Sequence, residues 1–358
     1  MITFQTIPAS VTSISDRAFA GCNNLIAFNV SENNKNYSSS DDGKILYNKD
    51  KTELIAYPSA MGNITIPDNV TSIGGSAFYC CESLINITIP DSVTSIGTSV
   101  FAWCDNLTEV TMGNNVTSIG GSAFYYCESL TNIRIPEGVT SINNSTFEGC
   151  KSLTSIIIPD SVTSIGSDAF YNCSNLIYNK YNNCLYLGSD NNPHLALMDF
   201  EYSSNITSCE ISTNTKVIAD GAFSYCNNLT NINVSEDNEN YSSSGAILFN
   251  KDKTKLIAYP SAMGDITIPD GVTSIGNHAF SGCSSLTSVT IPDNVTTIGS
   301  DAFYGCSNLT SVTFEDTNTW YYTRNENYTD GTEIDVTDTT QNAIYLNRDY
   351  CDGYWYKQ

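Results

Sequence analysis

A single pattern of apolar and polar positions recurs along most of the chain with a period of 23 residues. It reads I-P-D-x-V-T-S-I-G-x-x-A-F-x-x-C-x-x-L-T-x-V-T, and the five consecutive starts from Ile66 to Ile158 keep that spacing. The nine copies begin at Ile7, Ile66, Ile89, Met112, Ile135, Ile158, Ile211, Ile268 and Ile291. A period of about 20–29 residues with fixed apolar positions is typical of leucine-rich repeats, so the pattern predicts a repeat solenoid.

One copy alone cannot bury its apolar positions. In the copy that begins at Ile89 they are Ile89, Val93, Ile96, Val100, Phe101, Cys104, Leu107 and Val110. Stacked on its neighbours, each copy would supply one layer of a continuous core, with Phe as the largest side chain of the layer. The segment 108–112 alternates polar and apolar residues, as a strand with one buried face does. We therefore expect an α/β-type repeat solenoid, rich in β-structure, with one parallel β-strand in each coil.

Three inserts interrupt the period, near residues 30–65, 181–210 and 234–267. The first and the last are copies of each other, since both contain Tyr-Ser-Ser-Ser and Ile-Ala-Tyr-Pro-Ser-Ala-Met-Gly. Each insert has two short apolar runs around turn-forming residues, which predicts a β-hairpin. The solenoid with its hairpins is expected to span residues 1–314.

The repeat stops after Phe314, and residues 315–358 are rich in Trp and Tyr. Short alternating stretches in this tail predict strands. The expected role of the tail is a C-terminal cap over the last coil, because a solenoid needs its terminal core covered. The alternative is an aromatic binding or attachment module.

The charge balance excludes several classes of partner. The chain has 15 Lys and Arg against 38 Asp and Glu, a net charge of −23. Nucleic-acid binding and docking on anionic lipid both need a basic surface, so neither is expected. No apolar run reaches the roughly 18 residues of a membrane span, so membrane insertion is not expected either. The start of the chain lacks the features of a signal peptide, which favours a fragment or a mature chain without its leader.

Candidate catalytic and metal-ligating residues are few. The two histidines, His194 and His278, make a His-ligated metal site or a Ser–His relay unfavourable. The Asp that follows the repeat Pro, as at Asp91, is expected to be a turn-forming residue that also keeps the chain soluble, and a Ca²⁺ ligand is the alternative. We expect no metal, no cofactor and no enzymatic activity. A hydrolase built on the inserts is a minor alternative.

Nine of the 13 cysteines share one repeat position: Cys22, Cys81, Cys104, Cys127, Cys150, Cys173, Cys226, Cys283 and Cys306. This position should face the core, where a free Cys packs as a small apolar residue. We therefore expect reduced, buried thiols. Cys184 and Cys209 flank the second insert, and whether they form a disulfide stays open.

The repeat resembles the BspA-type, or Treponema-type, leucine-rich repeat over about residues 2–314. The segments Leu54–Pro58 and Leu256–Pro260 and the tail Tyr354–Lys357 are also similar to that family. The resemblance implies a curved solenoid that is extracellular or on a microbial cell surface. It also implies adhesion to host matrix or cell-surface proteins, and no catalytic residues carry over. The alternative function is a passive structural or surface-layer spacer without a specific ligand.

The outward positions of the predicted strands form the candidate binding surface, on the concave face of the solenoid. Most are small and polar, and curved solenoids use such faces to bind extended partners. The positions around Glu109, Arg134 and Ile157 differ most between coils. The predicted protein-binding residues are Glu109, Thr111, Asn132, Arg134, Ser155 and Ile157. The alternative is that this face is only a solvated sheet.

Overall fold

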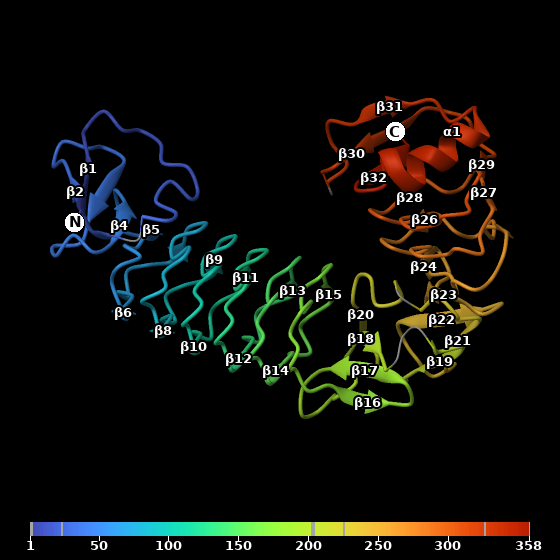
Figure 1. Cartoon of the computed structure of the whole chain (residues 1–358), viewed down its shortest axis with the longest axis horizontal. Helices are drawn as coiled ribbons and strands as arrows, with labels where there is room; N and C mark the ends of the chain where they lie inside the picture. Colours follow the sequence, from blue (N-terminus) through green and yellow to red (C-terminus); the bar gives the residue numbers. More distant parts are fainter. Residues whose placement is uncertain (1–2, 23, 202–204, 225, 326, 358) are drawn as a thin grey trace. The chain divides into compact units, whose positions relative to one another are not determined.

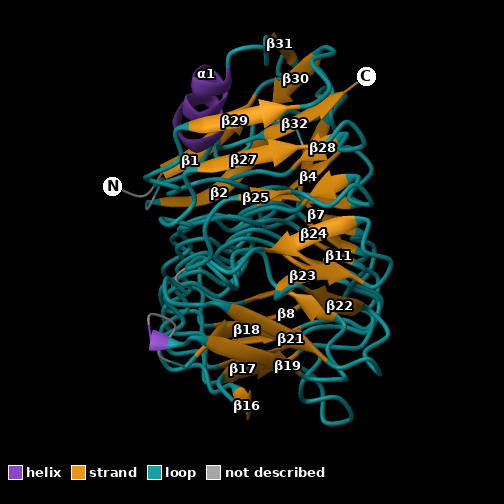
Figure 2. Cartoon of the chain, turned by 90° about the vertical axis from the view of Figure 1, so that its right-hand side faces the viewer, coloured by secondary structure: helices purple, strands orange, loops and turns teal. Residues whose placement is uncertain are grey.

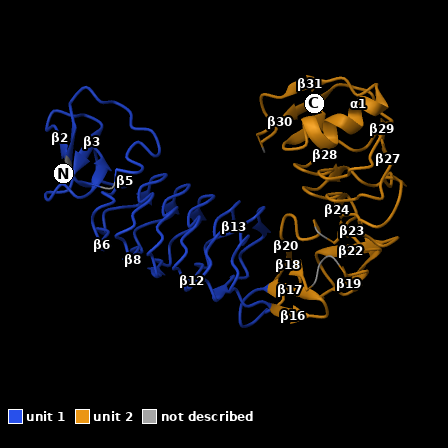
Figure 3. Ribbon diagram, in the orientation of Figure 1, with its two compact units in different colours: residues 1–178, 187–193 blue, residues 179–186, 194–358 orange. Residues whose placement is uncertain are grey.

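The computed structural model describes residues 3–22, 24–201, 205–224, 226–325 and 327–357. The chain forms two compact units, residues 1–178 with 187–193 and residues 179–186 with 194–358 (Figure 3). The predicted boundary at residue 314 falls inside the second unit, so the division into residues 1–314 and 315–358 stays a prediction.

The first unit contains the predicted ladder of parallel strands (Figure 1). Its strands are β6 (Ile64–Thr65), β8 (Asn86–Thr88), β10 (Glu109–Thr111), β12 (Asn132–Arg134) and β14 (Ser155–Ile157). Residues 23 positions apart are paired, so that Glu109 lies opposite both Asn86 and Asn132. In the last four strands the middle residue is buried and the outer two are exposed. The alternation in the sequence thus correctly predicts a parallel β-solenoid with one core-facing residue per strand.

A second parallel ladder, in two parts, runs along the same coils and was not predicted from the repeat pattern. Its two-residue strands are β7 (Ser72–Ile73), β9 (Ser95–Ile96), β11 (Ser118–Ile119), β13 (Ser141–Ile142) and β15 (Ser164–Ile165). Each contributes a buried Ile from the Thr-Ser-Ile-Gly part of the repeat. Backbone hydrogen bonds extend this ladder beyond the strands, as from Thr94 N–H to the Thr71 carbonyl and from Gly97 N–H to the Ile73 carbonyl. The pairing runs from β7 through β9 to β11 and, in a separate sheet, from β13 to β15. Neighbouring coils also share backbone bonds at the Phe segment, as from Phe101 N–H to the Ala123 carbonyl at 2.8 Å.

The first insert continues this second ladder. Strands β3 (Tyr37–Ser39), β4 (Leu46–Asn48) and β5 (Glu53–Ala56) are antiparallel, and β5 then pairs in parallel with β7. The predicted apolar runs of the insert lie on β4 and β5. Ahead of the insert, β1 (Thr3–Ile7) and β2 (Leu25–Val30) form a separate parallel pair.

The second unit repeats this plan. One sheet contains β16 (Asn179–Tyr181), β17 (Cys184–Leu187), β18 (Ala196–Phe200) and β20 (Val217–Ile218). A second sheet is the parallel pair β19 (Ser208–Ile211) and β21 (Asn231–Val234). A third sheet contains β25 (Ile266–Thr267), β27 (Ser288–Ile291) and β29 (Ser311–Phe314). The copied insert supplies β22 (Tyr241–Ser244), β23 (Ile247–Asn250) and β24 (Lys255–Ala258), which join β26 (Ser274–Ile275) and β28 (Thr297–Ile298).

The aromatic tail adds to the last of these sheets. It contains β30 (Trp320–Thr323), β31 (Thr332–Ile334), α1 (Thr339–Ile344), the π-helix η2 (Tyr345–Asp349) and β32 (Tyr354–Lys357). Strand β32 pairs antiparallel with β28 and β30. The rings of Trp320 and Trp355 are buried, with centroids 5.1 and 6.3 Å from that of Phe314. These are contacts expected of a cap, a role that stays a prediction. Figure 2 shows strands and turns through most of the chain, with α1 as its main helix.

The core of the first unit is a column of stacked rings. Phe78, Phe101, Phe124, Phe147 and Phe170 follow one another with centroids 5.2–5.4 Å apart. This column accounts for the invariance of Phe in the repeat, since each ring fills its layer and contacts the next.

Buried thiols accompany the rings. The Sγ atoms of Cys104, Cys127 and Cys150 lie 3.0, 3.1 and 3.2 Å from the carbonyl oxygens of Phe78, Phe101 and Phe124. Burial raises the pKa of each of these thiols well above its ordinary value, so the thiols stay protonated and donate. The prediction of reduced, buried cysteines is confirmed at eight of the nine repeat positions. Cys184 and Cys209 are also free thiols, buried in one apolar cluster.

Cys22 is the exception, because it is exposed. The coil that contains it is followed by the first insert rather than by another coil. Phe78 consequently stacks on Tyr57 of the insert, at 5.3 Å, while Phe19 packs against Phe28 at 4.9 Å. Cys226, whose coil is likewise followed by an insert, is buried, so the insert alone does not account for the exposure of Cys22.

Candidate functional site

The six predicted binding residues lie together on three adjacent strands, β10, β12 and β14. Asn132 pairs with both Glu109 and Ser155, and Arg134 pairs with Ile157. All six residues are exposed or partly exposed, because the alternating middle residues point into the core. We call this set, Glu109, Thr111, Asn132, Arg134, Ser155 and Ile157, the central patch. Its geometry is as predicted, whereas its binding role and the curvature of the face stay predictions.

The central patch offers mixed contact chemistry. The side chain of Ile157 is 41% exposed, which is unusual for an aliphatic residue on this sheet. Arg134 Nη2 lies 3.8 Å from Glu137 Oε1, but both side chains are more than two-thirds exposed, so this pair holds the guanidinium only weakly. A guanidinium and an aliphatic side chain at paired positions can together contact a partner's carboxylate and an adjacent apolar group.

The turns before the repeat cysteines hold an aromatic group that the sequence analysis missed. Trp103 stacks on Tyr126 with centroids 4.5 Å apart, and the ring of Tyr125 lies 5.7 Å from that of Trp103. Lys151 Nζ lies 5.9 Å from the Tyr126 centroid and 2.6 Å from Glu128 Oε1. The sequence signal for this group is the aromatic residues directly before two repeat cysteines: Trp103 before Cys104, and Tyr125 and Tyr126 before Cys127.

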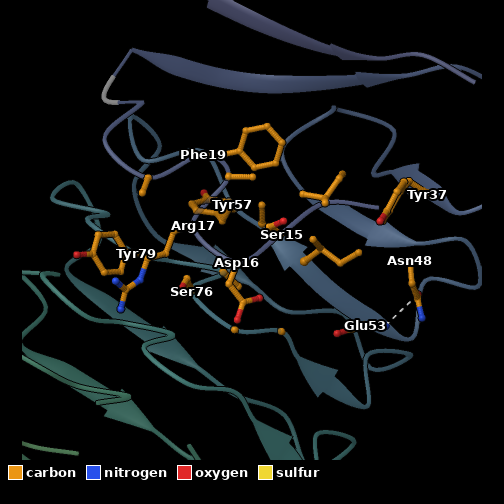
Figure 4. Close-up of a pocket in the computed structure, with 18 of the residues that line it drawn as sticks. Ser15, Asp16, Arg17, Phe19, Tyr37, Asn48, Glu53, Tyr57, Ser76 and Tyr79 are labelled. Carbon is orange, nitrogen blue, oxygen red and sulfur yellow. Dashed lines mark hydrogen bonds between the residues drawn. The ribbon is translucent and has the colours of Figure 1, made fainter. Parts of the chain in front are cut away.

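A pocket of about 260 Å³ lies beside the first insert (Figure 4). Its lining comes from the first coil (residues 14–20), from the insert (Asn36, Tyr37, Asn48, Glu53 and residues 55–57) and from the next coil (residues 74–77 and Tyr79). The charged residues in this lining are Asp16, Arg17 and Glu53. Sequence reasoning predicted the hairpin but not the pocket, which forms only where three distant segments meet.

Two polar groups of this pocket are already engaged. The Arg17 guanidinium lies 5.0 Å from the centroid of Tyr79 and donates to Ser99 Oγ at 3.3 Å. The Tyr57 hydroxyl donates to the Gly62 carbonyl at 3.0 Å, and burial raises the pKa of Tyr57 to about 12, so that it is neutral. Within the described chain, the carboxylates of Asp16 and Glu53 have no ion pair or side-chain hydrogen bond. These two carboxylates therefore leave acceptor oxygens available in the pocket.

The hydrolase alternative gains little from the structure. His194 Nδ1 lies 3.5 Å from Ser212 Oγ, with the rings of Tyr181 and Tyr186 packed around the imidazole. Ser212 is buried, and its Oγ accepts from the Asn214 N–H, so the Ser212 hydroxyl is closed to a substrate. The described residues also contain no group of three or more His, Cys, Asp or Glu side chains that could hold a metal ion.

The helices in the described part of the chain are all too short or too polar to cross a membrane.

Comparison with known proteins gives one family. The family model described as BspA type Leucine rich repeat region matches residues 1–41, 53–177, 194–266 and 258–349. No curated protein matches the chain.

Among solved structures, the chain is similar to a leucine rich cell surface protein from Faecalibacterium prausnitzii A2-165. The two are 30% identical with a TM-score of 0.37, over 87% of this chain and 69% of that one. The pneumococcal vaccine antigen PcpA is 19% identical with a TM-score of 0.39, over 78% and 70% of the two chains. A leucine rich repeat protein of T. pallidum is 20% identical with a TM-score of 0.27, over 76% and 86%.

Proposed function

Because the chain belongs to the BspA-type leucine-rich repeat family, we propose that it is a non-enzymatic repeat protein that binds a protein partner at a microbial cell surface or outside the cell. The partner is a host matrix protein or a cell-surface protein, and the chain acts as an adhesin. The single observation that supports a binding role most directly is the central patch. It departs from the small polar residues of the other coils on the same sheet.

The patch has the composition of a contact centre. Arginine is enriched among residues that dominate binding energy, and a partly exposed aliphatic residue gains from being covered. A specific interface needs roughly 800 Å² on each partner, so a partner would also cover neighbouring coils of the strand ladder. The small polar side chains there would let an extended partner lie close to the face of the sheet.

The test is a binding screen with a matched pair of variants. The full chain is immobilised and exposed to purified matrix and cell-surface proteins, and each partner is titrated to saturation. The test variant combines Glu109→Ser, Arg134→Thr and Ile157→Thr, which introduces residue types found at these positions in other coils. The control variant combines Asn86→Ser and Thr88→Ser on β8, where the sheet already has the common residue types.

A tenfold or greater loss of affinity in the test variant alone supports the proposal and corresponds to about 1.4 kcal/mol. Equal affinity of all three proteins would remove the central patch as the contact centre. The absence of saturable binding to every partner would favour the passive spacer instead.

A further inference from the structure

The pocket beside the first insert depends on two consecutive glycines. A Cβ placed on Gly75 would lie 2.6 Å from Asp16 Oδ2, and one placed on Gly74 would lie 3.2 Å from Glu53 Oε1. The first distance is shorter than real Cβ contacts, so any other residue at Gly75 would displace Asp16. Two carboxylates thus border a stretch of chain that has no side chains of its own.

The copied insert in the second unit has different residues at the corresponding positions. Asp220 occupies the position of Asp16, Asn277 that of Gly75, and Lys255 that of Glu53. There, Asn277 Nδ2 donates to Asp220 Oδ2 at 3.0 Å, so the carboxylate is satisfied by its own chain. Lys255 in addition supplies a positive charge where the first copy has a negative one.

The first copy has neither the amide donor nor the positive charge of the second copy. Gly75 removes the amide donor, and Glu53 replaces the cation with a second anion. Arg17 does not compensate, because its guanidinium is turned to Tyr79 and Ser99 on one side of the pocket, away from Asp16 (Figure 4). The remaining charge is complementary to a positively charged ligand.

We infer that this pocket binds a small protonated alkylamine, with the ammonium group at the carboxylates of Asp16 and Glu53. An ammonium group has three donors and no acceptor, which matches a site that offers acceptors. The aliphatic part of the ligand would contact Phe19 and Ile55 in the same lining. The volume of about 260 Å³ is just below the roughly 300–1,000 Å³ of drug-sized pockets, so an alkylamine of a few carbon atoms fits.

Two kinds of ligand present such an ammonium group: a free amine, and the side chain of a lysine in a protein. This site is separate from the central patch and goes beyond the proposed protein-binding function. Failure of one proposal leaves the other in place, because the substitutions that test them are on different coils.

The experiment measures binding of n-butylamine to the full chain by ligand-observed NMR at physiological salt. N-butylacetamide, which has the same alkyl group without the charge, is the ligand control. Nα-acetyl-lysine methylamide tests the protein source, since its backbone groups report whether a lysine within a chain fits. Two variants carry the residues of the second copy, Glu53→Lys and Gly75→Asn.

The expected result is saturable binding of n-butylamine, little binding of the neutral amide, and a loss of at least tenfold in both variants. Tighter binding of the lysine derivative would identify a protein lysine as the source, and weaker binding a free amine. The reverse double variant, Lys255→Glu with Asn277→Gly, should create a second site in the copied insert. Equal binding of the charged and neutral ligands, or unchanged binding in Glu53→Lys, would overturn the inference. Glu53 is at the surface, so this variant tests the site even where Gly75→Asn disturbs folding.

Discussion

Cys127 Sγ lies 3.1 Å from the carbonyl oxygen of Phe101, which belongs to the preceding coil. The same contact joins Cys173 to Phe147 and Cys306 to Phe280, both at 3.0 Å. The Phe101 carbonyl also accepts from the Cys104 N–H of its own coil, so the thiol is its second donor, and the aromatic ring of the same Phe fills the layer. Phe and Cys therefore act as a pair between consecutive coils, whereas Cys81 and Cys283, which follow the inserts, contact the carbonyls of Tyr57 and Tyr259 instead.

Removing one ring of the column should destabilise the first unit strongly. Phe124 is fully buried between Phe101 and Phe147, with centroids 5.3 Å away on both sides. Phe124→Ala is expected to cost about 3–5 kcal/mol, because it removes a large buried side chain from a layer that neighbouring coils hold open. Urea denaturation followed by far-UV circular dichroism measures the loss. Phe19→Ala, outside the column, is the control and should cost clearly less; equal losses would contradict the stacked column.

Stability should fall at alkaline pH because of the buried thiols. Burial raises the pKa of Cys81 and Cys173 to about 12, whereas an unfolded Cys titrates near 8.5. Below pH of about 8.5 both states are protonated and the stability is fully present. Between about 8.5 and 12 the unfolded chain loses the proton first, so stability falls as pH rises.

The decrease in stability per pH unit shows which thiols cause it. Each thiol contributes up to about 1.4 kcal/mol per pH unit. Denaturation midpoints measured under reducing conditions from pH 7.5 to 10.5 should fall less steeply in Cys173→Ala than in the unmodified chain. Cys22→Ala should leave the slope unchanged, because Cys22 is exposed. Identical slopes for all three proteins would show that the thiols do not cause the effect.

Acid should destabilise the second unit through Asp265. Hydrogen bonds from the backbone N–H groups of Ser288 and Thr287, both at 2.7 Å, lower the pKa of Asp265 to about 2. The stabilisation is present above the unfolded value of about 3.9 and is lost as pH falls toward 2.

The first unit provides the matched substitution. Asn63 occupies the equivalent position there, and its Oδ1 accepts from the N–H groups of Ile85 and Asn86, both at 3.0 Å. Asp265→Asn should keep the two bonds and flatten the decrease of the melting temperature between pH 5 and 2.5. Asp265→Ala should lower the melting temperature already at pH 7, where both bonds are lost. A pH profile of Asp265→Asn that matches the unmodified chain would exclude this carboxylate.

The layered core was predictable because every coil has the same apolar residue types at the same positions. Phe101 and Cys104 recur at fixed spacing, and only stacking can bury them in every copy. The placement of the central patch followed from the same periodicity, since Glu109, Asn132 and Ser155 are 23 residues apart and must be neighbours in register.

The pocket and the second ladder were not predictable in this way. The pocket depends on Gly75, Asp16 and Glu53, which belong to three segments brought together by the insert. The 23-residue repeat does not specify which residues of these three segments become neighbours. The two-residue strands such as Ser95–Ile96 are too short to show an alternation, so their hydrogen bonds appear only in the structure. Asn34 was also missed, although it is buried and bonds four backbone groups of the first coil and the insert.

Tyr57 and Tyr259 show how these inserts remain compatible with a periodic core. Each comes from an insert and stacks on the first Phe after it, Phe78 at 5.3 Å and Phe280 at 5.0 Å. An insert thus brings its own starting ring for the next column, so the length of chain between two coils is independent of the layer spacing. Such a segment behaves as a self-contained cassette, and a gene could acquire a second copy without altering the repeats on either side.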